Sequence, residues 1–149
     1  MAVTPVLACY RTCDAAIGGM TAWQVTTGPD GPHTNVVGSC PLGDASWVTP
    51  LYHLVVVLCE RDGTLVVVHP GREFQVVGTV QLEGQWPCHG AVDPTGRLMA
   101  VADYASGQVE FVDLSVPPDQ LSETSSISVR AVFSLDRWQI VKRVPMLTR

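Results

Sequence analysis

Short apolar runs separated by turn residues make up most of the pattern of hydrophobic and polar positions along this chain. Residues 98–102 are all apolar, and residues 108–114 alternate between apolar and polar, as buried and half-buried strands do. The preceding segment 93–96 has a turn composition, because proline presets φ for one corner and glycine accepts the last. No helical period occurs between residues 87 and 114. This stretch therefore predicts antiparallel strands joined by tight turns.

The same unit recurs along the chain with a period of 44 residues. Gly107 follows the apolar run 98–102, and Gly63 stands 44 residues earlier between the apolar runs 54–58 and 64–68. Gly19 stands another 44 residues earlier, before the strand-like residues 20–25. A period of about this length, built from short strands and turns, is typical of the four-stranded blade of a β-propeller. The expected strands of the two clearer units are 46–48, 52–58, 63–69 and 73–82, then 88–92, 98–102, 108–114 and 126–133.

About three repeats fill the 149 residues, whereas propellers close with roughly four to eight blades. The chain is therefore expected to be all-β and an incomplete propeller, either a fragment or one part of an assembly. Residues 1–115 are assigned to the N-terminal blades and residues 116–149 to a divergent C-terminal tail, because no glycine follows Gly107 and five of the nine basic residues lie beyond residue 129. The alternative is a β-sandwich or a single meander with accidental periodicity.

Composition and charge narrow the class of protein further. Apolar residues make up 46% of the chain and charged residues 15%, which suits strands that are buried on both faces. The net charge of −5 argues against nucleic acid as a partner, because phosphate binding needs a basic surface. The longest apolar run is too short to span a bilayer, and the N-terminus lacks the features of a signal peptide. Five cysteines at irregular spacing then indicate reduced thiols and a cytoplasmic location.

The sequence contains no motif for a cofactor or a metal ion. Cys9 and Cys13 are close together, but no second cysteine or histidine pair at zinc spacing accompanies them. The glycine-rich loops that bind nucleotides and the serine motif of α/β-hydrolases are also absent. We therefore expect neither a metal nor another cofactor, while the sequence leaves the oligomeric state open.

Two adjacent stretches carry a resemblance to a known family. Residues 87–97 read PCHGAVDPTGR, and residues 101–109 read VADYASGQV. They are similar to the patterns P-x-H-x-x-x-D-P-x-G-R and V-A-N-Y-x-x-G-x-V of the lactonase family of seven-bladed β-propellers, whose best-known type is 6-phosphogluconolactonase. Residues 46–48 and 54–60 are similar to two further patterns of that family in the preceding blade. The resemblance covers about residues 5–115, with Asp103 in place of the usual asparagine.

This resemblance implies that the chain holds about three blades of a probable seven. It also implies hydrolysis of a sugar lactone such as 6-phosphogluconolactone, in the pentose phosphate pathway, at a metal-free site near the central channel. Opening a lactone needs a base that activates water and donors that stabilise the oxyanion. His89 lies on the strand expected next to the channel, and because imidazole exchanges protons near neutral pH, His89 is the candidate catalytic residue. Glu60 and Asp103, which end corresponding strands one repeat apart, are the candidates for substrate binding.

Each of these residues also has a purely structural interpretation. A channel histidine can simply bond to a neighbouring backbone group, and Glu60 and Asp103 can be polar caps of apolar strands. The alternative functions are a non-catalytic propeller module that binds a partner protein through its rim, an inactive truncated remnant, and a lactonising cycloisomerase of the muconate type. Because the more diagnostic histidine motif of the family belongs to the next blade, we expect the isolated chain to have little or no lactonase activity.

Overall fold

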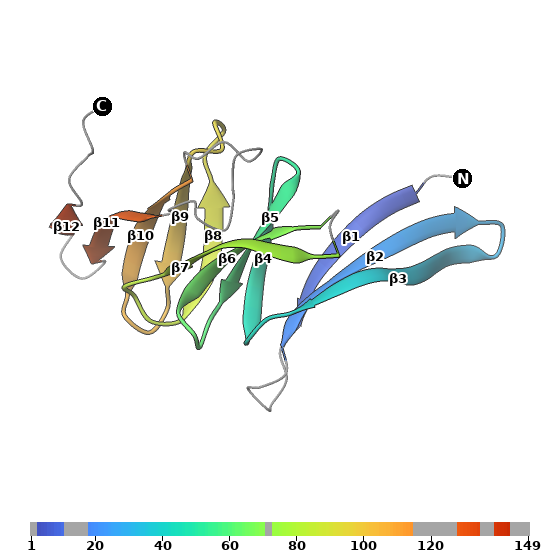
Figure 1. Ribbon diagram of the computed structural model, residues 1–149, viewed down its shortest axis with the longest axis horizontal. Helices are drawn as coiled ribbons and strands as arrows, with labels where there is room; N and C mark the ends of the chain where they lie inside the picture. Colours follow the sequence, from blue (N-terminus) through green and yellow to red (C-terminus); the bar gives the residue numbers. More distant parts are fainter. Residues whose placement is uncertain (1–2, 11–17, 71–72, 115–127, 135–138, 144–149) are drawn as a thin grey trace.

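The structure, a computed structural model, confirms the expected all-β fold. It describes residues 3–10, 18–70, 73–114, 128–134 and 139–143, which form three antiparallel sheets without any helix (Figure 1). Within these ranges there is accordingly no helix that is long and apolar enough to cross a membrane.

Each sheet is a meander in which strands that follow one another in the sequence pair with one another. The first sheet contains β1 (Val3–Tyr10), β2 (Gly19–Gly28) and β3 (Gly31–Pro41). The second contains β4 (Ala45–Leu51), β5 (Leu54–Cys59), β6 (Thr64–His69) and β7 (Gln75–Gln81). The third contains β8 (Pro87–Val92), β9 (Leu98–Asp103), β10 (Gln108–Asp113), β11 (Ser128–Ser134) and β12 (Gln139–Arg143). The strands expected in the second and third units are present within a few residues of their predicted positions, and β12 adds a fifth strand that the repeat did not predict.

The three sheets stand side by side in sequence order (Figure 1). Strands β4 and β8, the first strands of the second and third sheets, contact each other. Strand β1 contacts β4, as β5 contacts β8, and the strands β1-β2-β3 precede β4 as β5-β6-β7 precede β8, so β1 is the counterpart of β5. The described part of the first sheet therefore contains counterparts of β5, β6 and β7, and its inner position is not filled by a counterpart of β4.

The second sheet carries the core because it lies between the other two. All six residues of β5 are buried, so that side chains on both of its faces are removed from water. On one face, Leu54, Val56 and Leu58 pack with Met99 and Val101 of the third sheet. The opposite face packs on the first sheet, in a cluster that contains Met20, Ala22, Val55 and Val57. Burial of each such aliphatic side chain contributes about 1.5–3 kcal/mol, which explains why β5 is a continuous apolar run.

The period of 44 residues is confirmed in all three sheets, although its first glycine is used differently from the other two. Gly63 and Gly107 occupy equivalent turns, between β5 and β6 and between β9 and β10, with φ of 62° and 61°. Both need a left-handed backbone, which glycine adopts without strain. Gly19 is the first residue of β2 and pairs with Tyr10, the last residue of β1, so it also stands where the second strand of a hairpin begins. Unlike Gly63 and Gly107, it belongs to the paired strand and has no positive φ.

Candidate functional site

The inner strands β4 and β8 each begin with a β-bulge. The pairing of β4 with β5 shifts between Ala45 and Trp47, and the pairing of β8 with β9 shifts between Pro87 and His89. Ser46 and Cys88 are the extra residues of the two bulges. A bulge bends its strand and changes the direction of the next side chain, and bulges are frequent beside active sites. The two residues that follow the bulges are Trp47 and His89.

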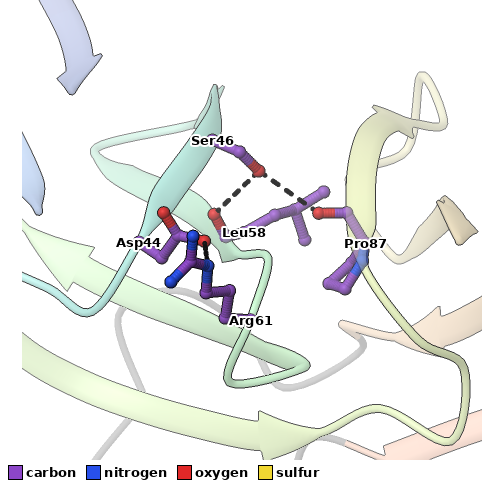
Figure 2. A network of polar contacts seen from close by, with 5 residues as sticks. All are labelled: Asp44, Ser46, Leu58, Arg61 and Pro87. Carbon is purple, nitrogen blue, oxygen red and sulfur yellow. Dashed lines mark hydrogen bonds and ion pairs between the residues drawn. The ribbon is translucent and has the colours of Figure 1, made fainter. Parts of the chain in front are cut away.

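Equivalent polar contacts hold both bulges. The Cys88 thiol donates to the carbonyl of Ala102 at 3.6 Å, and the Ser46 hydroxyl makes the corresponding contact with the carbonyl of Leu58 at 3.5 Å. The Ser46 hydroxyl also lies 3.2 Å from the carbonyl oxygen of Pro87. Figure 2 shows the Ser46 side chain between these two carbonyls, one in its own sheet and one in the next. Ser46 therefore links the starts of β4 and β8.

An ion pair fixes the segment that leads into β4. Asp44 is 3% exposed, and one of its carboxylate oxygens lies 3.4 Å from Nε of Arg61 (Figure 2). The backbone N–H of Glu60 donates to the carbonyl of Asp44 at 3.1 Å. The turn after β5 is thus joined to the start of β4 by a backbone hydrogen bond and by an ion pair.

The rings of Trp47 and His89 are in contact across the two sheets. Their centroids are 4.0 Å apart, with an angle of 38° between the ring planes. The indole is partly buried against the core, whereas His89 is exposed. No described residue forms a hydrogen bond with the imidazole. Both residues directly follow a bulge at the start of an inner strand, so they occupy equivalent positions in the two sheets.

Glu60 and Asp103 do not occupy equivalent positions, which corrects the expectation from the sequence. Strand β5 ends at Cys59 and β9 ends at Asp103, so Asp103 corresponds to Cys59, and Glu60 corresponds to Tyr104. Glu60 is half-buried in the turn after β5, while Asp103 is only 2% exposed. Asp103 therefore does not share the exposed surface on which His89 lies.

The environment of Asp103 contains a second acid, which sequence reasoning missed. Glu110 is 0% exposed and lies on the same buried face of the third sheet. Burial, followed by the charge of the neighbouring Glu110, raises the pKa of Asp103 to about 8. The raised pKa favours the protonated form of Asp103 at neutral pH. The alternating pattern of β10 gave no signal for this, since it suggested that Val109 and Phe111 would be the buried residues.

A shallow pocket of about 270 Å³ lies at the opposite ends of β4 and β8 from the bulges. Its lining includes Leu51, Tyr52 and the turn residues Asp93 and Gly96. Asp93 is its one acidic group, and a hydrogen bond from the Thr95 hydroxyl, with backbone N–H bonds, lowers its pKa to about 2. Because this carboxylate is already engaged in holding its own turn, the pocket offers no free acid or base. We therefore place the candidate site at the bulges.

Among the described residues, neither a reactive cysteine nor a metal-binding cluster belongs to the candidate site. Cys40, Cys59 and Cys88 are free thiols. Burial raises the pKa of the Cys59 thiol to about 11, which keeps it protonated and unreactive. In the described ranges, no three histidine, cysteine, aspartate or glutamate side chains gather closely enough to hold a metal ion. Cys9 and Cys13 lie outside the residues whose side chains are described.

Comparison with known proteins identifies one family and two solved structures with a similar fold. The sequence matches the family described as Lactonase, 7-bladed beta-propeller over residues 42–132. No curated protein sequence matches the chain. Among solved structures, it is similar to the β-propeller domain of Cps50 (Swd1) from Myceliophteria thermophila, with a TM-score of 0.54 and 10% identity over 77% of this chain. It is also similar to hydrazine synthase from Kuenenia stuttgartiensis, with a TM-score of 0.50 and 18% identity over 89% of this chain. The chain spans 42% and 47% of those two chains, and at such identities the likeness shows the fold alone.

Proposed function

The chain belongs to the lactonase family of seven-bladed β-propellers, and from this premise we propose that it supplies the N-terminal blades of an enzyme that hydrolyses a sugar lactone, such as 6-phosphogluconolactone, to the open acid. The observation that carries the proposal is the exposed imidazole of His89, which follows a bulge on an inner strand and rests against Trp47. In this role the enzyme acts in cytoplasmic carbohydrate metabolism and needs no cofactor.

His89 acts as the general base in the proposed reaction. Its imidazole accepts a proton from a water molecule as that water attacks the carbonyl carbon of the lactone. The tetrahedral oxyanion then collapses, the bond between the carbonyl carbon and the ring oxygen breaks, and the imidazolium returns the proton to the leaving oxygen. The product is a hydroxy acid. Contact with Trp47 limits the rotation of the imidazole and so holds it in one orientation.

Glu60 and Asp103 are proposed to bind the substrate. The carboxylate of Glu60, half-buried beside the start of β4, can accept hydrogen bonds from sugar hydroxyls. Asp103 is 2% exposed, so it reaches a substrate only if the backbone above it moves. In this proposal Glu60 binds the substrate in the observed conformation, whereas Asp103 binds it only after a rearrangement of the backbone.

The test is to follow the histidine ring signals by NMR while 6-phosphogluconate, the stable hydrolysis product, is added to the chain. The chain contains four histidines, and we expect the signal of His89 to shift while those of His33, His53 and His69 stay unchanged. Any lactone hydrolysis above the spontaneous rate should be lost in His89→Ala, because a general base contributes about 10²–10⁴-fold. The His33→Ala variant, an exposed histidine in β3, is the matched control. If the chain is folded and its His89 signal does not shift when 6-phosphogluconate is added, His89 is not part of the binding site.

A second candidate, a propeller module that binds a partner protein through its rim, is favoured by one observation. Val36 and Val37 of β3 are 54% and 59% exposed, although valine is usually buried. The protein-binding module becomes the preferred function if the addition of 6-phosphogluconate leaves all four histidine signals unchanged. The third candidate, a lactonising cycloisomerase of the muconate type, predicts a different ligand. In that case the product lactone of the cycloisomerase would shift the His89 signal, and 6-phosphogluconate would not.

A further inference from the structure

Two carboxyl groups are buried together where the loop between β7 and β8 crosses the third sheet. Asp103, at the end of β9, is 2% exposed, and Glu110, in β10, is 0% exposed. Glu110 accepts hydrogen bonds from two consecutive backbone N–H groups of that loop, from Glu83 at 3.0 Å and from Gly84. Neither carboxyl oxygen of Asp103 receives a hydrogen bond from a described donor. Glu110 therefore has hydrogen-bond donors in the loop, whereas Asp103 has none among the described residues.

A single shared proton completes the pair. Asp103 can donate to Glu110 only when it is protonated, and this is the arrangement that gives its buried carboxyl group a partner. A metal ion fits less well, because it requires several free oxygen ligands, whereas both oxygens of Glu110 already accept from backbone N–H groups. The raised pKa of Asp103, about 8, agrees with this geometry. The pair therefore holds one proton at neutral pH and one negative charge.

The loop rests directly on this pair. A Cβ atom on Gly84 would lie 2.3 Å from the carboxyl carbon of Asp103, so the backbone at Gly84 is in close contact with the acid. The other side of the loop is bonded to the turn after β9, where the N–H of Gln85 donates to the Ser106 hydroxyl at 3.1 Å and the N–H of Tyr104 donates to the carbonyl of Trp86 at 2.9 Å. Any movement of Asp103 toward water must displace Gly84 and strain these bonds.

Trp86 reports the position of the loop. Its φ of 60° is a left-handed conformation, which is unfavourable for a residue with a bulky side chain. Its ring lies nearly parallel to that of Tyr104, with an angle of 8° and centroids 6.5 Å apart. The strained backbone gives the loop a tendency to leave this conformation, and the bonds to Glu110 and to the β9–β10 turn oppose it.

We propose that Asp103 and Glu110 form a proton-operated latch, which holds residues 83–86 against the third sheet while the pair keeps one proton and releases them when both carboxyls are ionised. The physical cause is the repulsion between two buried negative charges, which is relieved when Asp103 turns outward into water. Raising the pH through about 8 therefore opens the loop. The latch does not depend on the proposed lactonase activity, although the loop leads into β8 three residues before His89.

Other charged groups near this end do not account for the effect. Glu83 is exposed on the loop itself, and Arg61, Asp62 and Asp44 lie at the start of β4 and in the turn after β5. Among the charged groups, Glu110 is the one that raises the pKa of Asp103. This assigns the pH response to the pair alone and makes the two acids the targets for substitution.

The test is a pH titration of tryptophan fluorescence between pH 6 and 9.5, with the contribution of Trp86 obtained by difference from Trp86→Phe. We expect a transition centred near pH 8 in the unmodified chain and no such transition in Asp103→Asn, whose amide donates to Glu110 at every pH. In Glu110→Gln the transition should also be absent, because an ionised Asp103 then has no second negative charge beside it. Hydrogen exchange at Glu83 and Gly84, compared with Asp103→Asn at the same pH, should accelerate across the same range.

Each outcome decides the proposal. A transition of equal size and midpoint in Asp103→Asn overturns it, as does an undiminished transition in Glu110→Gln. If Asp103→Asn does not fold, which circular dichroism shows, the presence or absence of the transition in Glu110→Gln decides alone. A fluorescence transition without faster exchange at Gly84 also overturns it, because the rings would then respond to pH without release of the loop.

Discussion

The contact between Gly38 and Phe74 gives the sharpest test of how the first and second sheets are joined. Phe74, in the loop between β6 and β7, is 7% exposed and belongs to the cluster between these sheets. Its ring lies over Gly38 of β3, so that a Cβ atom added there would be 1.7 Å from Cε2 of the phenyl ring. Carbon atoms in contact are about 3.5–4.0 Å apart, so the ring would have to retreat by about 2 Å.

The magnitudes follow from this geometry. Gly38→Ala should destabilise the chain by about 1–3 kcal/mol through overpacking. Phe74→Ala should cost about 3–5 kcal/mol, as for other buried phenylalanines. With the ring removed, the added methyl group has space, and Gly38→Ala should become stabilising by about 0.5–1 kcal/mol because alanine in a strand loses less backbone entropy than glycine. The two substitutions should therefore show a coupling energy of at least about 1 kcal/mol.

The assay is equilibrium urea unfolding of the unmodified chain, both single variants and the double variant. Gly28→Ala is the control, because a Cβ atom there would lie 3.7 Å from the His33 ring, an ordinary contact, and its stability should change by less than about 0.5 kcal/mol. Additive effects of Gly38→Ala and Phe74→Ala, or an undiminished stability of Gly38→Ala alone, would refute the packing of Phe74 on β3.

Two further predictions concern polar contacts that hold turns and strand starts. The carboxylate of Asp93 accepts bonds from the Thr95 hydroxyl and from backbone N–H groups, which lower its pKa from 3.8 to about 2. Its contribution to stability is therefore complete above pH 4 and is lost as the pH falls toward 2, so the difference in Tm between Asp93→Ala and the unmodified chain should shrink over that range. Ser46→Ala removes the hydroxyl that reaches Leu58 and Pro87 and should cost about 1 kcal/mol in urea unfolding, more than Cys88→Ala, whose thiol is a weak donor. Equal losses in the two variants would contradict the special role of Ser46 between sheets.

Much of the fold could be predicted because it depends on local chemistry. The continuous apolar run of β5 and the glycines of the two hairpin turns are local features, which a few neighbouring residues reveal. Gly63 and Gly107 have a left-handed φ, which confirms that both glycines form turns. The spacing also placed Gly19 correctly at the start of a strand, β2. It did not show that Gly19 is itself paired with Tyr10 instead of forming a left-handed turn, since that depends on the register with β1.

The candidate site likewise has a part that the sequence could predict and a part that only the structure could show. From the sequence alone it was possible to choose His89 and place it on an inner strand, because the repeat identifies the first strand of each unit. Only the tertiary structure decided that the rings of His89 and Trp47 touch, that Asp103 is buried beside Glu110, and that Gly84 lies over the acid. The physical reason is distance along the chain: strand and turn formation depend on neighbouring residues, whereas burial and ionisation depend on groups that only folding brings together. The sequence therefore determined the strands and the repeat, and the packing of one sheet on the next decided which of its acids keeps a proton.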